Sequence, residues 1–414
     1  MLSLSHQNIP IAIIGGGIHG LSIAMQLIRD RPQVAKHLVV LDRHPEPLTA
    51  WRRKTEGQGM TFLRSPAVHH IDTEPLGIVE YARSTDRLDE LAPPYGQPST
   101  TLFLDFCRHA IEQHGLKQVY YPFDVATLRW DKGSGRFPFR IISQRNEGFR
   151  ARCVILATGS EDFPYLPAEF VAWQRRFPKR VRHSCDFNLQ ALAQAEIGCA
   201  TAKIVIVGGG LTAGTLAKNL VELGKQVVLI TRKPLKIQQF DFEPLWVGPK
   251  ALGEFRRESD WEKRYEIVQE VRGAGSMTDE IAEELMRHTV GSPPAVSLYS
   301  EASILQIDQL DKLQIQTTKG TIDDVDLLIL ATGYRFDLRR YPFLSNLIKQ
   351  HAIPILHGLP LLDENLQLTP VENLFGSGVI AQLQLGPASE NIVGATLAYE
   401  RLRHYLLREI PTLY

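Results

Sequence analysis

Two stretches of this 414-residue sequence share one pattern, in which a short apolar run leads into a cluster of glycines and then into apolar residues at helical spacing. The first spans residues 11–28, IAIIGGGIHGLSIAMQLI, and the second spans residues 203–224, KIVIVGGGLTAGTLAKNLVELG. This order is typical of a strand, a tight turn and a helix. Glycines and a histidine interrupt the first stretch, which argues against a membrane-spanning helix there. The duplicated pattern predicts an α/β protein.

The first glycine cluster has the spacing of a dinucleotide-binding turn. In Gly15-x-Gly17-x-x-Gly20, the glycines allow a tight turn, a close approach of backbone to a pyrophosphate, and packing of helix on strand, in that order. Asp42 ends the next apolar run, 22 residues after Gly20, where a carboxylate accepts hydrogen bonds from ribose hydroxyls. We therefore predict a dinucleotide site here; the alternative is a glycine turn that only serves packing.

The second glycine cluster differs from the first at the position that selects the nucleotide. Thr231 takes the place of Asp42 and is followed by Arg232 and Lys233. Loss of the carboxylate removes repulsion of a ribose 2′-phosphate, and a guanidinium can bind that phosphate through paired hydrogen bonds. The second site is therefore predicted to bind NADPH rather than NADH, and the acidic first site to bind FAD. The alternative for the two basic residues is a solvated loop.

Composition argues against several other classes of protein. The 46 lysines and arginines balance the 46 aspartates and glutamates, so a nucleic-acid partner is not expected. The four cysteines form no CxxC pair, which favours a reducing cytoplasm and argues against a dithiol relay. The thirteen histidines show no metal-binding spacing. An enzyme acting on a small molecule fits these features, and a homo-oligomer is compatible with them.

A third pattern is also duplicated. An apolar strand ends in Ala-Thr-Gly at residues 157–159 and again at residues 331–333, where Tyr334 follows. With its motifs in this order, the chain resembles the two-dinucleotide-domain flavoproteins, and among them the flavin-containing and N-hydroxylating monooxygenases that use FAD and NADPH. The string FPKRVRHSCDF at residues 177–187 is similar to their FxGxxxHSxxF motif, with Lys179 in place of the glycine.

The resemblance extends over nearly the whole chain and implies a flavin-binding segment near the C-terminus. Gly378 and the Gly386-Pro387 pair lie in this segment, ahead of a helix expected at about residues 389–408. The positive end of that helix would face the flavin and stabilise its reduced form. Asn391 either donates a hydrogen bond to the flavin or caps the helix.

A loop on the flavin side is suggested by residues 59–82, which resemble the corresponding loop of lysine and ornithine N-hydroxylases. No substrate site follows from this likeness. Trp51 and Arg52 precede the loop and are candidates to cover the flavin or the adenine, although Trp51 fits an ordinary core position equally well.

The site residues fall into two sets, and no catalytic residue or metal ligand is assigned. The set assigned to FAD is Gly15, Gly17, Gly20, Asp42, Arg43, Trp51, Arg52, Ala157, Thr158, Gly159, Gly378, Gly386, Pro387 and Asn391. The set assigned to NADPH and to the linker between domains is Gly208, Gly210, Thr212, Ala213, Arg232, Lys233, Ala331, Thr332, Gly333 and Tyr334.

The expected architecture is two Rossmann-like dinucleotide-binding domains, the second inserted into the first. Residues 1–165 and 325–414 would form a discontinuous FAD domain, and residues 166–324 an NADPH domain with a helical elaboration at residues 240–295. By resemblance, NADPH reduces the flavin, oxygen forms a C4a-hydroperoxyflavin, and an amine or sulfide takes the distal oxygen. The alternatives are an NADPH-dependent reductase that passes electrons to a quinone or another acceptor, which Lys179 slightly favours, and a flavin-bound sensor.

Overall fold

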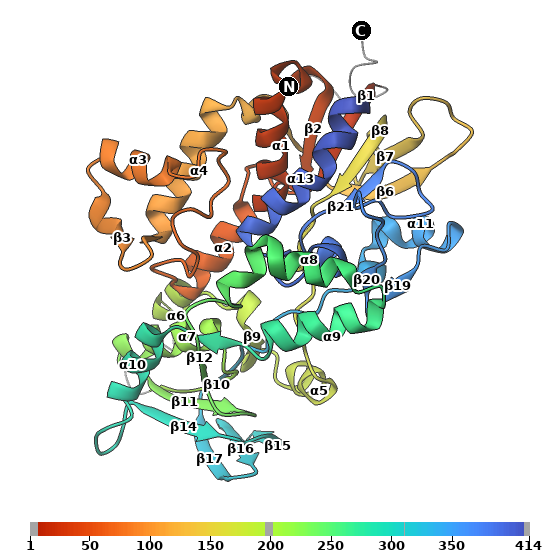
Figure 1. Cartoon of the computed structure of the whole chain (residues 1–414). Coiled ribbons are helices and arrows are strands. Elements are labelled where there is room, and N and C mark those ends of the chain that lie inside the picture. The colour runs from red at the N-terminus through yellow and green to blue at the C-terminus, as the bar shows by residue number, and fades with distance from the viewer. Residues whose placement is uncertain (1–6, 195–201, 310, 410–414) are drawn as a thin grey trace.

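The computed structural model describes residues 7–194, 202–309 and 311–409, and Cys199 lies outside them. The described chain builds two sheets, each covered by helices, which places the protein in the expected α/β class (Figure 1). In the view of Figure 1 the first sheet lies above the second, and α8 (Pro249–Arg257) and α9 (Trp261–Arg272) lie between them. None of the described helices is long and apolar enough to cross a bilayer.

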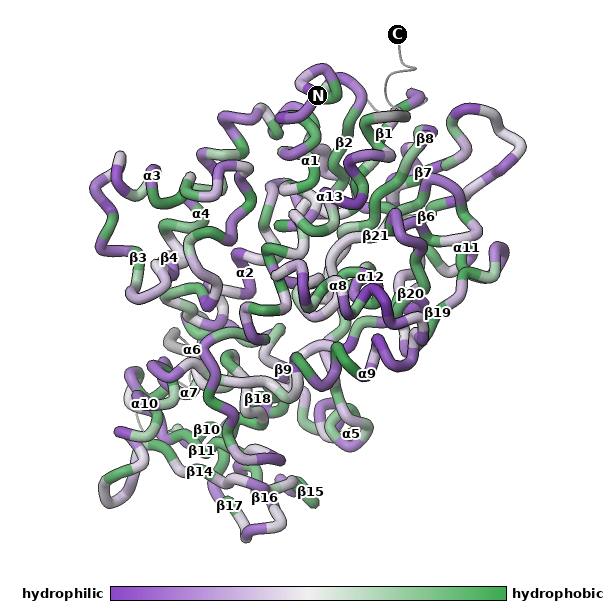
Figure 2. The backbone as a smooth tube through the Cα atoms, viewed as in Figure 1, coloured by the Kyte–Doolittle hydropathy of each residue, from purple (hydrophilic) through white to green (hydrophobic). Residues whose placement is uncertain are grey.

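The first sheet has a parallel centre and an antiparallel edge. Its order is β5 (Tyr120–Pro122), β2 (Leu38–Asp42), β1 (Asn8–Ile14), β8 (Gly148–Leu156), β7 (Phe139–Ser143) and β6 (Val125–Trp130), and β21 (Leu374–Gly376) also pairs with β8. Strands at the centre of a parallel sheet are buried on both faces, which is why β1 from Ile9 onward and the last four residues of β8, 153–156, are apolar and buried. Figure 2 shows them as hydrophobic segments inside the upper half of the molecule.

Helices from both ends of the chain cover this sheet. They are α1 (Ile18–Asp30), α2 (Thr49–Gln58), α3 (Gly77–Ser84), α4 (Thr100–Gln113), α11 (Ser345–Gln350), α12 (Gln382–Leu385) and α13 (Ile392–Glu409). α13 lies along α1 (Figure 1), and the Tyr399 hydroxyl donates to Asp30 Oδ2 at 2.8 Å. The N-terminal and C-terminal parts of the chain therefore share one core. α13 begins at Ile392, three residues later than expected.

The second sheet is entirely parallel, in the order β14 (Val296–Ser300), β11 (Gln226–Thr231), β10 (Lys203–Val207), β18 (Leu327–Leu330) and β9 (Val181–His183). Side chains alternate between its faces. Ile204 and Ile206 pack toward α7 (Leu211–Glu222), and Val205 and Val207 pack toward α5 (Ala168–Arg176) and an antiparallel meander. The meander consists of β15 (Ile304–Gln309), β16 (Leu313–Thr317) and β17 (Gly320–Val325).

Smaller elements complete the fold. They are the helices α6 (Leu189–Gln194) and α10 (Asp279–Arg287), the parallel pair β12 (Lys236–Ile237) and β13 (Ser276–Met277), and the antiparallel pairs β3 (Leu91–Ala92) with β4 (Gln97–Pro98) and β19 (Ile355–Leu356) with β20 (Leu359–Pro360).

The expected return to the first unit at residue 325 needs correction. β18 follows that point but pairs with β10 and β9 of the second sheet. The chain therefore leaves the second sheet only after Leu330. Partner choice in a sheet depends on tertiary packing, which a local apolar run does not encode.

The elaboration at residues 240–295 also divides differently from the prediction. α8 and α9 pack against α12 of the first unit, and Arg264 on α9 donates to the Leu383 carbonyl at 3.1 Å. α10 packs on α7 of the second unit. Part of this insertion therefore closes over the first unit, where it reaches the candidate site.

Candidate functional site

The first glycine elbow, residues 15–20, joins β1 to α1. Gly17 is the N-cap of α1, and no side chain caps that end, so the first N–H groups of the helix remain available to an anion. A Cβ at Gly20 would lie 1.8 Å from the Gly15 carbonyl oxygen, so this position requires glycine. A Cβ at Gly17 would meet no atom within 4 Å, which leaves room for a pyrophosphate against the backbone.

Asp42 stands at the end of β2 beside this elbow. Its Oδ2 accepts from the Gly16 N–H at 2.6 Å and its Oδ1 from the His44 N–H at 2.8 Å, which fixes the carboxylate. An ionised carboxylate has further lone pairs, so it can still accept from ribose hydroxyls. The next residue, Arg43, pairs with Asp162 at 2.7 Å.

A cavity of about 1210 Å³ starts at the first elbow and continues past α2 and the C-terminal segment to α9 and the linkers between the sheets. Most of the residues assigned from sequence line it. They are Gly15, Gly17, Asp42, Arg43, Trp51, Ala157, Thr158, Gly159, Gly378 and Asn391 of the FAD set, and Thr212, Thr332, Gly333 and Tyr334 of the second set.

The other assigned residues do not line the cavity, and some have different roles. They are Gly20, Arg52, Gly386, Pro387, Gly208, Gly210, Ala213, Arg232, Lys233 and Ala331. Arg52 points to Glu46 at 3.8 Å, and the Pro387 carbonyl accepts from Arg272 at 2.7 Å. Ala213 is fully buried against the second sheet, as the packing position of its elbow should be.

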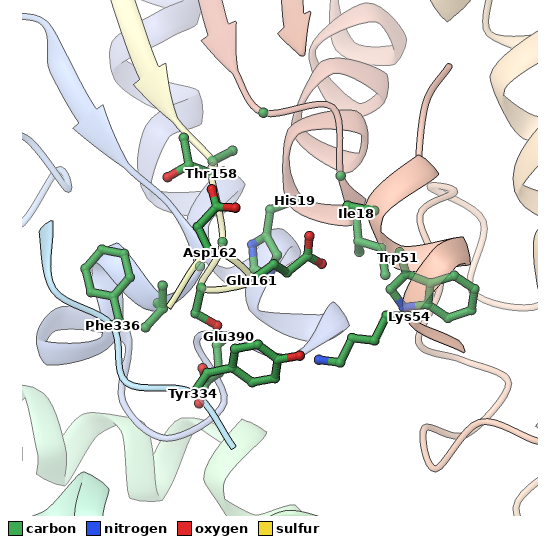
Figure 3. Close-up of a pocket in the computed structure, with 18 of the residues that line it drawn as sticks. Ile18, His19, Trp51, Lys54, Thr158, Glu161, Asp162, Tyr334, Phe336 and Glu390 are labelled. Atoms are coloured by element: carbon green, nitrogen blue, oxygen red, sulfur yellow. The ribbon is translucent and has the colours of Figure 1, made fainter. Parts of the chain in front are cut away.

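Trp51 lies both at the margin of the first core and in the wall of the cavity. Its ring lies 5.0 Å from that of Phe103 at the margin of the first core, and it also faces the cavity (Figure 3). It can therefore contribute to packing and still contact a ligand.

The C-terminal segment closes against the first elbow. His19 Nδ1 lies 3.0 Å from Ser377 Oγ, and a Cβ at Gly378 would lie 3.5 Å from the His19 ring. Burial lowers the pKa of His19 to about 4, so the ring is neutral near pH 7. The Ser389 hydroxyl donates to the Gly378 carbonyl. These contacts hold backbone of this segment beside the first elbow.

The side chain of Asn391 forms hydrogen bonds with the second unit through both its amide nitrogen and its amide oxygen. Its Nδ2 donates to Asp241 Oδ2 at 2.8 Å, and its Oδ1 accepts from Arg272 at 2.8 Å. Arg272 Nε also pairs with Glu390 Oε1 at 2.8 Å. Asn391 therefore takes part in a network that crosses between the two units.

The second glycine elbow, residues 208–213, is less open than the first. Gly210 is the N-cap of α7, but Gly275 lies against it: a Cβ at Gly210 would be 3.4 Å from the Gly275 Cα. Thr212, in the first turn of α7, donates to Gln58 Oε1 at 3.4 Å and lines the cavity. Arg232 and Lys233 follow β11 as exposed side chains, and no described carboxylate forms an ion pair with either.

Two segments connect the sheets: one follows the first Ala-Thr-Gly and contains Tyr165, and the other begins at the second Ala-Thr-Gly, residues 331–333. Hydrogen bonds between these two linkers fix the second one. The Thr332 hydroxyl donates to the Tyr165 carbonyl, and the Tyr165 N–H donates to the Gly333 carbonyl at 2.8 Å. This pairing holds Tyr334 in the cavity wall, where Lys54 Nζ lies 4.4 Å from the centroid of its ring (Figure 3).

Lys54 gives the cavity wall a buried cation. No described carboxylate forms an ion pair with it, although Glu161 and Glu390 are arranged around the same space (Figure 3). Burial lowers the pKa of Lys54 and raises the pKa of Glu161. An anionic group and a cationic group of one ligand could both be complemented here.

Five site residues were missed by the sequence analysis: Lys54, Arg64, Asp241, Arg272 and Glu390. Arg64 donates to Asp241 and to three consecutive carbonyls, those of residues 238, 239 and 240. Nothing in the sequence around these residues distinguishes them from polar residues that are solvated. Burial, with Asp186 beside it, raises the pKa of the Cys185 thiol to about 12, so this thiol is protonated near pH 7.

Comparison with known proteins bears on the chemistry. The family model of the L-lysine 6-monooxygenase/L-ornithine 5-monooxygenase family matches residues 61–336, two thirds of the chain. The chain belongs to this family. Membership confirms the predicted resemblance and supports the monooxygenase interpretation over the reductase alternative. No curated protein sequence matches the chain significantly.

Solved structures of this family have the same fold. The ornithine hydroxylase of Pseudomonas aeruginosa is 18% identical, with a TM-score of 0.78 over 98% of this chain and 100% of that chain. The ornithine N-hydroxylase of Kutzneria sp. 744, in a structure with reduced FAD, NADP⁺ and L-ornithine, is 16% identical, with a TM-score of 0.77 over 97% and 99%. The L-lysine 6-monooxygenase of Pseudomonas syringae is 19% identical, with a TM-score of 0.74 over 97% and 99%.

Proposed function

We propose that this protein is an FAD- and NADPH-dependent monooxygenase that hydroxylates the side-chain amine of a small amino acid of the ornithine and lysine class. The family match carries the proposal, because residues 61–336 include the second elbow and both linkers. The substrate class is supported by the structural relatives, which are an ornithine hydroxylase, an ornithine N-hydroxylase and an L-lysine 6-monooxygenase.

FAD fits the first elbow. The open space at Gly17, the uncapped N-terminus of α1 and the fixed Asp42 carboxylate match the needs of a diphosphate and a ribose. The adjoining C-terminal segment at Gly378 would border the flavin ring. We assign FAD to the unit formed by the first sheet and NADPH to the unit formed by residues 166–330.

NADPH fits the second elbow through Arg232 and Lys233. Both lie at the end of β11, and β11 carries Thr231 where the first site carries Asp42. The 2′-phosphate therefore meets two cations and no carboxylate, which selects NADPH over NADH.

The overall reaction is RNH₂ + O₂ + NADPH + H⁺ → RNHOH + H₂O + NADP⁺. NADPH supplies two electrons, one oxygen atom enters the N–O bond, and the other leaves as water. FAD, when bound, supplies the hydride acceptor and the oxygen chemistry. The residues of the chain orient the substrate and exclude water. We expect Lys54 to attract the carboxylate of the substrate and the remaining lone pairs of Glu390 and Asp241 to accept from its α-ammonium group, while the side-chain amine reacts in its neutral form.

The proposal is tested with the purified protein, NADPH and either L-ornithine or L-lysine. We expect a yellow protein whose flavin is bleached by NADPH, and formation of a hydroxylamine in proportion to the NADPH consumed. Bleaching followed by quantitative release of hydrogen peroxide with both amino acids, and with a panel of other amines, would contradict it. We also place the protein in the cytoplasm, in keeping with Cys107, Cys153 and Cys185, none of which forms a disulfide with another described cysteine.

A further inference from the structure

The two elbows differ in what faces their middle glycine. At Gly17 the space that a Cβ would occupy is open, whereas at Gly210 the backbone of Gly275 borders that space, its Cα 3.4 Å from where the Cβ would lie. A Cβ on Gly275 would come 2.9 Å from Gly210 Cα, so the two backbones are in direct contact. The middle glycine is where the backbone of such an elbow approaches a pyrophosphate. Gly275 and the pyrophosphate of a dinucleotide therefore compete for one space.

Gly275 belongs to a short connection, residues 272–275, which we call the strap. One end is the last residue of α9, and Arg272 there donates to the Pro387 carbonyl and to Asn391 Oδ1 and pairs with Glu390. The strap is thereby tied to the C-terminal segment of the first unit. Charge-assisted hydrogen bonds of this kind are stronger than neutral ones, so the tie is specific.

The other end of the strap is held by the second unit. It continues into β13, which pairs with β12, and Met277 is fully buried in the core beneath α7. Between its two ends the strap is Gly-Ala-Gly, exposed to solvent. A movement of Gly275 away from Gly210 would therefore be transmitted over three residues to Arg272, while β13 stays in place.

We propose that the strap covers the second elbow and that NADPH must displace it. Arg272 is then a positioning residue. When the strap moves, the contacts of Arg272 with Glu390 and Asn391 change, so binding of NADPH alters the surroundings at the edge of the flavin site. The inference rests on the proposed function, because it needs NADPH at the second elbow. It makes two predictions that a rigid preformed site does not make.

The first prediction concerns Gly275→Ala. Gly275 has no positive φ, so its backbone accepts alanine, and the contact with Gly210 alone excludes a Cβ. The variant should disfavour the covered state and so lower the cost of uncovering the elbow. We expect the dissociation constant of NADP⁺, measured by calorimetry on the FAD-loaded protein, to fall about tenfold. Ala274→Ser, a change at the exposed middle of the strap, is the matched control and should leave it unchanged.

The second prediction concerns Arg272→Gln, which releases the other end. NADP⁺ should again bind about tenfold more tightly. In the wild-type protein NADP⁺ should also alter the visible absorption of oxidised FAD, because the strap shifts Arg272. This spectral response should be lost in Arg272→Gln. It should be partly restored in Arg272→Lys, which keeps the charge. Lys263→Gln, an exposed change on the same helix, should behave as wild type.

The outcomes distinguish a failure of the proposed function from a failure of the strap inference alone. If the wild-type protein binds no NADP⁺, the proposed function and this inference both fall. If NADP⁺ binds, but Gly275→Ala leaves its dissociation constant unchanged or raises it, the strap is part of a preformed site and this inference alone is overturned. An undiminished spectral response in Arg272→Gln would likewise overturn the role of Arg272.

Discussion

Arg64 Nη1 donates to Asp241 Oδ1 at 2.6 Å and so joins the loop after α2 to the segment that crosses from the second sheet. The same guanidinium also reaches the carbonyls of residues 238–240 and the Ser276 hydroxyl. Asp241 in turn accepts from Asn391. One arginine thus fixes the position of a carboxylate in the wall of the cavity and the entry to β13.

Loss of this arginine should be costly. Its side chain is only 11% exposed, so Arg64→Gln would leave several partly buried acceptors without this donor. We expect the free energy of unfolding of the FAD-loaded protein to fall by about 3 kcal/mol. Denaturant unfolding followed by flavin release measures it. Arg108→Gln, which removes an exposed pair with Asp105, should cost less than about 1 kcal/mol; equal losses would show that Arg64 does not link the two units.

Valine substitutions can separate the role of Gly17 in cofactor binding from the role of Gly20 in packing. Gly17→Val places a side chain where the protein has no atom, so the apoprotein should fold normally and yet fail to retain FAD. Gly20→Val meets the Gly15 carbonyl and should prevent folding itself. Circular dichroism and the flavin content after purification distinguish the cases. A folded Gly17→Val protein that is still yellow would place FAD elsewhere.

Arg232→Ala should affect NADPH and spare NADH, because only NADPH carries the 2′-phosphate. We expect KM for NADPH to rise roughly tenfold to a hundredfold, as for the loss of a charge-assisted contact, with KM for NADH within about twofold. Steady-state oxidation of each nucleotide gives both constants. Equal changes in KM for NADPH and KM for NADH would show that Arg232 does not bind the 2′-phosphate and lies in a solvated loop.

His19 should make the folded protein sensitive to mild acid. Its pKa is about 4 in the folded state, below the value near 6.5 expected when it is unfolded, so between these pH values the unfolded chain binds a proton that the folded chain does not. This contribution to stability is complete above pH 6.5 and is lost as the pH falls to 4, by roughly 3 kcal/mol. Unfolding at several pH values should show a shallower pH dependence in His19→Gln; an identical profile in both proteins would refute the assignment.

The elements that the sequence could predict are those specified locally. Glycine spacing, a preceding apolar run and helical periodicity lie within some twenty residues of one another, and both elbows and their strands are found where expected. Asp42 was predictable for the same reason, because its place follows from the length of one strand-helix-strand unit.

The network that shapes the cavity could not be predicted, because its partners are distant in the chain. Arg64 and Asp241 are 177 residues apart, and Arg272 and Asn391 are 119 apart. On sequence, Arg272 is one charge among many on a polar helix. The domain boundary predicted at residue 325 was wrong for a related reason, because the apolar sequence of β18 does not indicate which of the two sheets the strand joins.

The most direct test of the central claim is an anaerobic stopped-flow experiment with two mixing steps. The FAD-loaded protein is first reduced by NADPH and is then mixed with oxygen and L-ornithine or L-lysine. The account predicts that NADPH bleaches the flavin and that one hydroxylamine is formed for each flavin reoxidised. Failure of NADPH to reduce the flavin, or reoxidation that yields only hydrogen peroxide, would contradict it.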